Sequence, residues 1–253
     1  HNVPDIQTLG LPETVINLTQ NKKGLILITG GTGSGKSTTL ASMIQKISQD
    51  NNSHIITIED PIEYLYDHSK SIVNQREVGS DTSNFASALR SCLRQDPDVV
   101  AIGELRDVES MSAAITIAET GHLVLGTLHT NNASGTITRL VDAFPPEKQD
   151  IIRTNLSMSL LAIVSQQLVP NKNNERSLAL EVLINTPSIK ALIRENNIHQ
   201  IDNYILSGQK DGMIRMDDYL FSLYTDNIIS KQKALSFAFN SNEMGKKLNS
   251  PNI

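Results

Sequence analysis

The chain has 253 residues, a formal net charge of −5 and an ordinary globular composition, with 39% hydrophobic and 19% charged residues. One cysteine excludes an internal disulfide framework and a cysteine-rich zinc site, and an acidic balance with 4% aromatic residues disfavours a nucleic-acid partner. No apolar run reaches the roughly 18 residues that a membrane-spanning helix needs, and the chain does not start with a signal-peptide pattern. We therefore expect a cytoplasmic protein with no transmembrane segment.

Four short apolar runs, each followed by polar residues, are typical of strands buried on both faces of a parallel sheet. These runs are residues 24–30, 54–60, 98–104 and 122–129. Helical patterns lie between them, over residues 37–47, 81–95 and 107–120. This alternation predicts an α/β fold with a mainly parallel sheet and helices on both of its faces.

The pattern changes after Pro145 and Pro146. Residues 147–168 are expected to form one long amphipathic helix, and residues 176–184 are expected to form a strand. Further helices are expected over residues 187–196, 197–207, 216–225 and 230–240. These patterns predict a mostly helical C-terminal subdomain packed on the sheet, followed by a frayed polar tail.

Residues 30–38, GGTGSGKST, match the phosphate-binding pattern G-x-x-x-x-G-K-[ST] between a predicted strand and a predicted helix. Glycines permit backbone conformations in which successive N–H groups surround phosphate oxygens, and the helix N-terminus adds positive potential. The candidate nucleotide-binding residues are Gly30, Gly31, Thr32, Gly33, Ser34, Gly35, Lys36, Ser37 and Thr38. We expect Lys36 to reach the β- and γ-phosphates of ATP, Ser37 to bind Mg²⁺ and Thr38 to contact the α-phosphate. The alternative is a glycine-rich turn that matches the pattern by chance.

Polar residues stand at the carboxyl ends of the predicted strands, where open α/β sheets bind their ligands. They are Glu59, Asp60 and Glu63 after the second strand, Glu104 after the third and His129 after the fourth. Hydrolysis needs a group that orients water toward the γ-phosphorus, and Glu104 is the candidate catalytic residue. Gly103 stands where many phosphate-loop ATPases place a metal-binding Asp. Glu59 and Asp60 are therefore candidates to hold Mg²⁺, directly or through water.

Glu63 and His129 are further catalytic candidates, the histidine as a sensor of the γ-phosphate. The acids could instead be solvated charges or helix caps, and His129 could be a structural histidine. A neighbouring subunit often supplies an arginine to phosphoryl transfer. The candidate interface arginines are Arg76, Arg90, Arg94, Arg106 and Arg139. Arg90 and Arg94 are spaced i, i+4 on a predicted helix, where they could face a neighbour or form surface ion pairs.

The ordered set of motifs resembles that of the PilT-type members of the type II/IV secretion ATPase superfamily, the type IV pilus retraction motors. The matching segments are GGTGSGKST (30–38), TIEDPIEY (57–64), DPDVVAIGELRD (96–107) and AETGHLVLGTLHT (118–130), with NQREVG (74–79) also family-like. SIKALIRE (188–195) stands where retraction ATPases carry an AIRNLIRE-like motif, and it replaces the first Ala, the Arg and the Asn. The alternative for this segment is an ordinary amphipathic helix.

The resemblance implies a RecA-like P-loop ATPase core at residues 21–170, after an interdomain linker and first helix at residues 1–20. It places a helical C-terminal subdomain at residues 171–240 and a flexible tail at residues 241–253. It also implies that the family's N-terminal PAS-like domain is absent from this chain. Gly103-Glu104 is normal for the family, which implies that Glu104 is the catalytic glutamate and His129 a γ-phosphate contact, with a less defined role for His122.

The implied function is a homohexameric Mg-ATPase that powers type IV pilus retraction. It would act in the cytoplasm, peripheral to the inner membrane, against the pilus platform protein. The alternative is a related secretion or conjugation ATPase of the same superfamily. Intact Lys36, Ser37 and Glu104 disfavour a non-hydrolysing scaffold, and the acidic balance disfavours a nucleic-acid translocase. Cys92, as the only cysteine, excludes the four-cysteine zinc element that is usual in extension and type II secretion ATPases.

Overall fold

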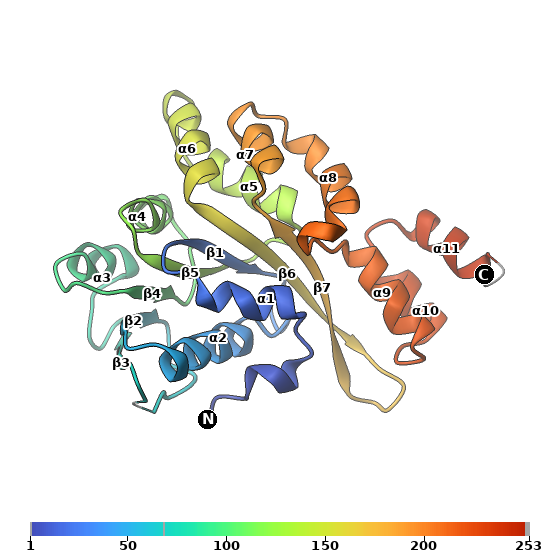
Figure 1. Cartoon of the computed structure of the whole chain (residues 1–253), viewed down its shortest axis with the longest axis horizontal. Coiled ribbons are helices and arrows are strands. Elements are labelled where there is room, and N and C mark those ends of the chain that lie inside the picture. The colour runs from blue at the N-terminus through green and yellow to red at the C-terminus, as the bar shows by residue number, and fades with distance from the viewer. Residues whose placement is uncertain (1, 68, 251–253) are drawn as a thin grey trace.

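A seven-stranded sheet forms the centre of the computed structural model, which describes residues 2–67 and 69–250 (Figure 1). The strands are β1 (Gly24–Thr29), β2 (His54–Glu59), β3 (Ile72–Glu77), β4 (Val99–Ile102), β5 (Leu123–Leu128), β6 (Leu160–Pro170) and β7 (Arg176–Ile184). Their order is β3-β2-β4-β5-β1-β6-β7, and all pairs are parallel except β6–β7. The predicted α/β fold with a mainly parallel sheet is confirmed.

Strand β1 shows why the apolar runs are continuous. Leu25 and Leu27 belong to one hydrophobic cluster, Ile26 and Ile28 belong to another, and all four are fully buried. Side chains alternate between the two faces of a strand, so a strand covered on both faces needs apolar residues at every position.

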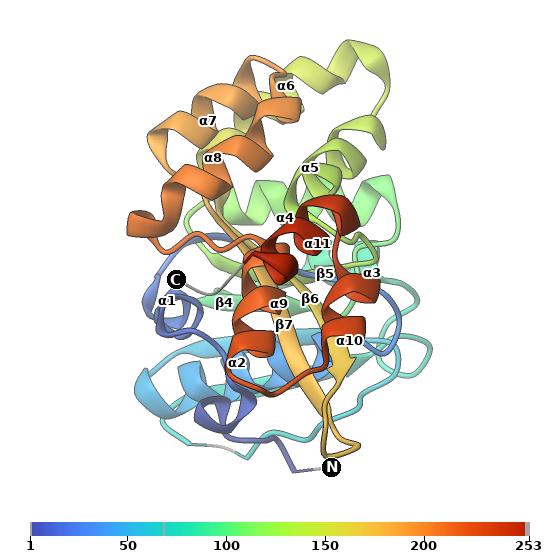
Figure 2. The same cartoon turned by 90° about the vertical axis from the view of Figure 1, so that its right-hand side faces the viewer.

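Helices cover both faces of the sheet, as Figures 1 and 2 show. One face carries α1 (Glu13–Asn17) and α2 (Lys36–Asp50), together with the short 3-10 helices η1 (Ile6–Leu9) and η2 (Leu18–Gln20). The other carries α3 (Phe85–Cys92), α4 (Val108–Glu119), α5 (Ala133–Asp142), α6 (Pro146–Ser159), α7 (Pro187–Arg194) and α8 (Ile201–Ser207). Among the residues that the structure describes, no helix has the length and apolar composition to span a bilayer.

The last three helices form a cluster of their own beside β6 and β7, facing the viewer in Figure 2. They are α9 (Met216–Thr225), α10 (Lys231–Phe237) and α11 (Ser241–Asn249). We name these three helices the C-terminal cluster. Two further 3-10 helices, η3 (Ile198–Gln200) and η4 (Gly208–Asp211), flank α8.

The long helix expected over residues 147–168 is wrong. Helix α6 ends at Ser159, and β6 begins at Leu160 and pairs with β1 on one side and β7 on the other. Ser165 and Gln166 are almost fully buried in this inner strand, where they contact the end of β1 and the loop after it. These inward-facing polar residues imitate the polar positions of an amphipathic helix, so the sequence pattern favoured a helix.

The frayed tail expected from residue 241 is also wrong as far as residue 249. Helix α11 begins after Asn240, whose side chain accepts a hydrogen bond from the Glu243 N–H at 3.0 Å. Met244 and Leu248, one helical turn apart, are buried in the C-terminal cluster. Residues 251–253 of the expected tail lie outside the described residues.

Besides β6 and α11, strand β3 and helix α5 were also not predicted from the sequence. Strand β3 lies at the edge of the sheet, and its residues are mostly polar or exposed, so it offers no apolar run. Helix α3 is shorter than the expected 81–95, because it starts after the capping residue Asn84 and ends at Cys92. The expected strand over residues 176–184 matches β7, which carries the sheet across the expected subdomain boundary at residue 170.

Candidate functional site

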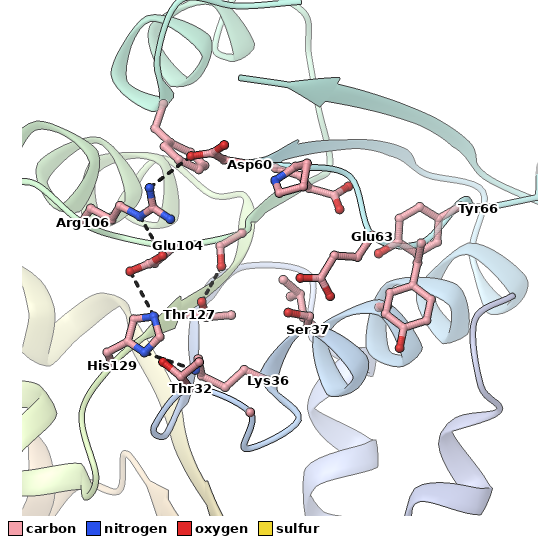
Figure 3. A pocket seen from close by; sticks show the side chains of 18 residues that line it. Thr32, Lys36, Ser37, Asp60, Glu63, Tyr66, Glu104, Arg106, Thr127 and His129 are labelled. Carbon is pink, nitrogen blue, oxygen red and sulfur yellow. Dashed lines mark hydrogen bonds and ion pairs between the residues drawn. The ribbon is translucent and has the colours of Figure 1, made fainter. Parts of the chain in front are cut away.

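A cavity of about 270 Å³ lies beyond the carboxyl ends of β1, β2, β4 and β5 (Figure 3). The sheet order makes β4, β5 and β1 direct neighbours, with β2 next to β4. The cavity is lined by predicted site residues from each of these strand ends. They are Thr32, Gly33, Lys36 and Ser37 after β1, Glu59, Asp60 and Glu63 after β2, Glu104 and Arg106 after β4, and His129 after β5.

The phosphate loop (residues 30–38) begins with a close backbone contact. Gly30 has φ of +148°, and a Cβ atom at this position would lie 2.4 Å from the backbone oxygen of Gln166 on β6. Gly35, with φ of +89°, directly precedes α2, so Lys36 is the first residue of that helix. The expected strand–loop–helix geometry is present, with the N-terminus of α2 at the cavity.

Lys36 is only 8% exposed, although it carries an ammonium group. Its Nζ donates hydrogen bonds to the carbonyl oxygens of Gly30 and Gly31, both at 2.9 Å, and lies 3.5 Å from His129 Nδ1. Burial lowers the pKa of Lys36, and the charges of Glu104 and Glu63 partly oppose this shift. The ammonium group is thus held at the loop by neutral carbonyl oxygens, for which an entering anion would compete.

Glu104 stands in the middle of a chain of polar contacts across the strand ends. Its Oε2 accepts a hydrogen bond from Arg106 Nε at 2.7 Å, and its Oε1 lies 3.2 Å from His129 Nε2. Arg106 Nη1 also pairs with Asp60 Oδ2 at 3.1 Å. Bonding to Glu104 raises the pKa of Arg106. Together with the contact from His129 to Lys36, a continuous network joins the ends of four strands (Figure 3).

The two predicted acidic magnesium ligands, Glu59 and Asp60, are already engaged by protein groups. Glu59 Oε1 accepts hydrogen bonds from Thr57 Oγ1 at 2.6 Å and from Gln75 Nε2 at 3.0 Å, and Asp60 pairs with Arg106. Within the described ranges, no group of three or more His, Cys, Asp or Glu residues could hold a metal ion. The side chain of Ser37 lines the same cavity, and Mg²⁺ commonly takes few protein ligands together with water and phosphate oxygens. The site therefore fits a magnesium ion that arrives with a nucleotide.

The segment after β2 reaches over α2. Thr38 Oγ1 lies 3.0 Å from the Tyr64 hydroxyl, so this predicted α-phosphate contact faces the segment of residues 57–64. Glu77, at the end of β3, accepts a hydrogen bond from the Ile62 N–H at 3.0 Å and holds the segment in place. Tyr66 lines the cavity, and burial raises the pKa of its hydroxyl.

Two supporting residues, Thr127 and Gln166, were missed by the sequence reasoning. The Thr127 hydroxyl donates to the Gly103 carbonyl, and its own carbonyl accepts from the Leu105 N–H at 2.9 Å, so both bonds brace Glu104. Gln166 Nε2 donates to the Ser34 carbonyl at 3.1 Å and supports the phosphate loop. Polar residues inside otherwise apolar strands are the signal that could have found both.

Of the candidate arginines, Arg106 is the one that lines this cavity. Arg76 donates hydrogen bonds to Ser91 and Gln95, and Arg90 forms an exposed 3.4 Å ion pair with Glu109. Arg94 lies beyond the end of α3, so the expected i, i+4 pair of Arg90 and Arg94 on one helix is wrong.

Two other candidates lie away from the cavity lining. Arg139 lies on α5 and lines a different depression. His122 precedes β5 at the opposite end of that strand from His129, and its Nδ1 lies 3.0 Å from the Ile117 carbonyl.

Comparisons with known proteins give consistent matches. The family model described as "Type II/IV secretion system protein" matches residues 2–211. The twitching motility protein of Neisseria gonorrhoeae is 46% identical over 96% of this chain and 65% of its own length. The type IV pilus retraction ATPase PilT of Pseudomonas aeruginosa is 46% identical over 90% of this chain and 67% of its own length. The chain thus spans about two thirds of the length of these relatives: 65% of the twitching motility protein and 67% of the retraction ATPase.

The solved structures include one with high similarity over nearly the whole chain. The crystal structure of the pilus retraction motor PilT with bound ADP is 50% identical to this chain. The match covers 97% of this chain and 70% of that one, and the TM-score is 0.91.

Proposed function

The chain belongs to the type II/IV secretion system protein family, and on this premise we propose that it is an ATP-hydrolysing motor that powers type IV pilus retraction. The observation that carries the proposal is the network from Lys36 through His129 and Glu104 to Arg106 and Asp60. It connects a phosphate-binding loop to an acid suited to orient water, which is the arrangement that nucleotide hydrolysis requires.

Each group has a defined role in the proposed reaction. The N–H groups of the phosphate loop and the N-terminus of α2 bind the phosphates, and Lys36 exchanges its two carbonyl partners for phosphate oxygens. Glu104 orients the attacking water, while Arg106 holds its carboxylate in place. His129 lies between Glu104 and Lys36 and senses whether a γ-phosphate is present.

Magnesium, when bound with the nucleotide, supplies positive charge against the phosphates. Ser37 is the proposed protein ligand, with Glu59 and Asp60 reached through water. Glu63 lines the same cavity and is retained as a further catalytic candidate.

The names of two relatives support the retraction role over secretion or conjugation, since one is a twitching motility protein and the other is a pilus retraction ATPase. We extend the proposal to a homohexamer that acts in the cytoplasm against the platform protein at the inner membrane. Trans-acting arginines would come from the set of Arg76, Arg90, Arg94 and Arg106. The division into a core at residues 21–170 and a C-terminal subdomain at residues 171–240 is part of the proposal, with β7 continuing the sheet.

The test is Mg²⁺-dependent phosphate release from ATP for the wild type and for Glu104→Gln. The substitution keeps the size of the side chain and removes its charge, so turnover is expected to fall about 100-fold or more while nucleotide binding remains. Glu147→Gln is the matched control, because Glu147 is an exposed glutamate on α6 outside the cavity, and its turnover should equal the wild-type value. Activity of Glu104→Gln within roughly threefold of wild type would contradict the assignment.

The same assay tests assembly when the protein concentration is varied. A rate per subunit that rises with concentration supports sites completed between subunits. A rate that stays constant down to concentrations at which sizing detects only monomers contradicts the ring motor.

A further inference from the structure

Glu181 is a buried carboxyl group that the proposed reaction does not use. It lies in β7 and is 5% exposed, and no ion pair with a cationic side chain is found for it among the described residues. Its Oε1 accepts a hydrogen bond from the Ala133 N–H at 2.8 Å, and the Met216 N–H also acts on the carboxyl group and lowers its pKa. A buried acid needs such partners, and here both are backbone groups at helix starts.

The two N–H groups belong to different parts of the molecule. Ala133 is the first residue of α5, which begins shortly after His129. Met216 is the first residue of α9, which begins the C-terminal cluster. One carboxyl group therefore bonds the N-terminus of α5 and shares a cavity with the N-terminus of α9, and both helix dipoles favour a negative charge there.

The segment between His129 and α5 is short and is held to the first turn of that helix. Thr130 Oγ1 lies 2.6 Å from Thr136 Oγ1, and the Asn132 side chain accepts a hydrogen bond from the Gly135 N–H at 2.8 Å. A displacement of the first turn of α5 would therefore move the segment that carries His129.

We propose that Glu181 is a positioning residue of the nucleotide site. Glu181 fixes the position of the start of α5 relative to the C-terminal cluster, and the start of α5 in turn fixes the position of His129. Loss or gain of the γ-phosphate at His129 would thereby be transmitted to α9 through one carboxyl group. We call the contacts of Glu181 with the starts of α5 and α9 the Glu181 tie. The effect of this tie on catalysis rests on the proposed ATPase function, whereas the tie itself is a property of the fold.

The surroundings of Glu181 make the tie sensitive to protonation. A second cavity of about 270 Å³ is lined by Glu181, by Asp202 from α8, by Asp217 from α9 and by Asn132 before α5. Burial, with the charges of Asp202 and Asp217, raises the pKa of Glu181 to about 7. Arg215 lines the same cavity, but it forms a bidentate pair with Glu243 at 3.0 and 3.2 Å. A protonated carboxyl group accepts less well from two N–H groups, so the tie weakens as the pH falls below 7.

The test compares Glu181→Gln with Asp217→Asn. Asp217 is also buried and accepts two backbone hydrogen bonds, from Phe239 at 2.7 Å and Asn240 at 2.9 Å, but both partners lie in or beside the C-terminal cluster. Amide hydrogen exchange of residues 130–136 is measured without nucleotide at pH 8, above the pKa of Glu181, so that the charge of Asp217 does not decide the protonation of Glu181. Glu181→Gln should accelerate it about tenfold, because a charged acceptor is replaced by a neutral amide whose second position is an NH₂ donor and cannot accept. Asp217→Asn should leave this segment unchanged.

The catalytic arm is a double-mutant cycle with His129→Asn, measured at pH 8. Glu181→Gln should lower kcat about tenfold in the wild-type background and less than about twofold in the His129→Asn background, because the two residues act through one element. Asp217→Asn should change kcat by the same factor in both backgrounds.

Unchanged exchange of residues 130–136 in Glu181→Gln, or an equal loss of kcat in both backgrounds, would overturn the proposal. If Glu181→Gln does not fold, Glu181→Asp replaces it, since it keeps the charge and shortens the reach, and it is judged by the same two readings. If the wild type does not hydrolyse ATP, the proposed function fails, and the exchange measurement still decides whether the tie exists.

Discussion

The phosphate loop contains two adjacent glycines that the structure distinguishes sharply. At Gly30 the backbone has φ of +148°, and an added Cβ would lie 2.4 Å from the Gln166 backbone oxygen. At Gly31 the same atom would meet nothing within 4 Å. Alanine at the two positions therefore tests the energetic importance of the close approach of the loop to β6.

The expected cost of Gly30→Ala has two parts. A non-glycine residue in a sparsely populated backbone region costs about 1–3 kcal/mol. Relieving a clash with a backbone oxygen requires a shift of β6 or of the loop, since no side-chain rotation removes it, and such overpacking costs about 1–3 kcal/mol. The free energy of unfolding should thus fall by about 2–6 kcal/mol, whereas Gly31→Ala should stay within about 0.5 kcal/mol of wild type.

Urea unfolding of both variants measures the difference, and a fluorescent ATP analogue measures nucleotide affinity. Gly30→Ala should lower the urea midpoint by about 1 M or more and weaken binding as well. If Gly30→Ala and Gly31→Ala unfold at the same urea concentration, the contact between the loop and β6 has been misjudged.

Three further predictions concern other parts of the chain. Thr127→Val removes the hydroxyl that braces Gly103, so kcat should fall about tenfold with little change in KM in steady-state ATPase assays, and a raised KM with unchanged kcat would contradict the bracing role. Because burial raises the folded-state pKa of Glu181 from 4.5 to about 7, ionising this carboxyl group costs global stability even though the ionised form makes the stronger local hydrogen bonds. The free energy of unfolding therefore holds its full contribution from this group below pH 4.5 and loses it as the pH rises through 7. Urea unfolding of the wild type relative to Glu181→Gln should therefore show a loss of about 3 kcal/mol between pH 4.5 and pH 8, and parallel curves would refute the raised pKa. Met244→Ala should cost about 2–5 kcal/mol and expose α11 to limited proteolysis, while an unchanged digestion pattern would indicate that α11 is not docked.

The sequence predicted the sheet best where burial is uniform. The runs of β1, β2, β4 and β5 are apolar at successive positions because both faces of these strands are covered, and a run of this length between turn residues is typical of a buried parallel strand. β3 escaped prediction because it is an edge strand, and a polar edge strand has no periodic signature. β6 was mistaken for helix because Ser165 and Gln166 bond to β1 and the phosphate loop and interrupt the apolar run.

The sequence predicted which residues lie at the strand ends of the candidate site, but it did not predict the contacts between their side chains. Glu104, His129 and Lys36 could be placed at one edge of the sheet, since parallel strands bring their carboxyl ends together. The pairing of Arg106 with Glu104 and Asp60 depends on side-chain directions in a loop. Glu181 could not be identified as a tie between helices, because its two partners are backbone groups distant in the chain.

The position of β1 between β5 and β6 has a consequence for synthesis on the ribosome. Thr29 hydrogen-bonds to Ser165, which is 136 residues later in the chain. The strand that leads into the phosphate loop is therefore translated before both of its partner strands and has both edges unpaired until β5 and β6 have been made. A nascent chain that ends before Gln166 lacks the hydrogen bond that supports the loop, so the complete phosphate-binding loop forms only after β6 has been made, and until then the apolar β1 strand is an exposed, unpaired segment.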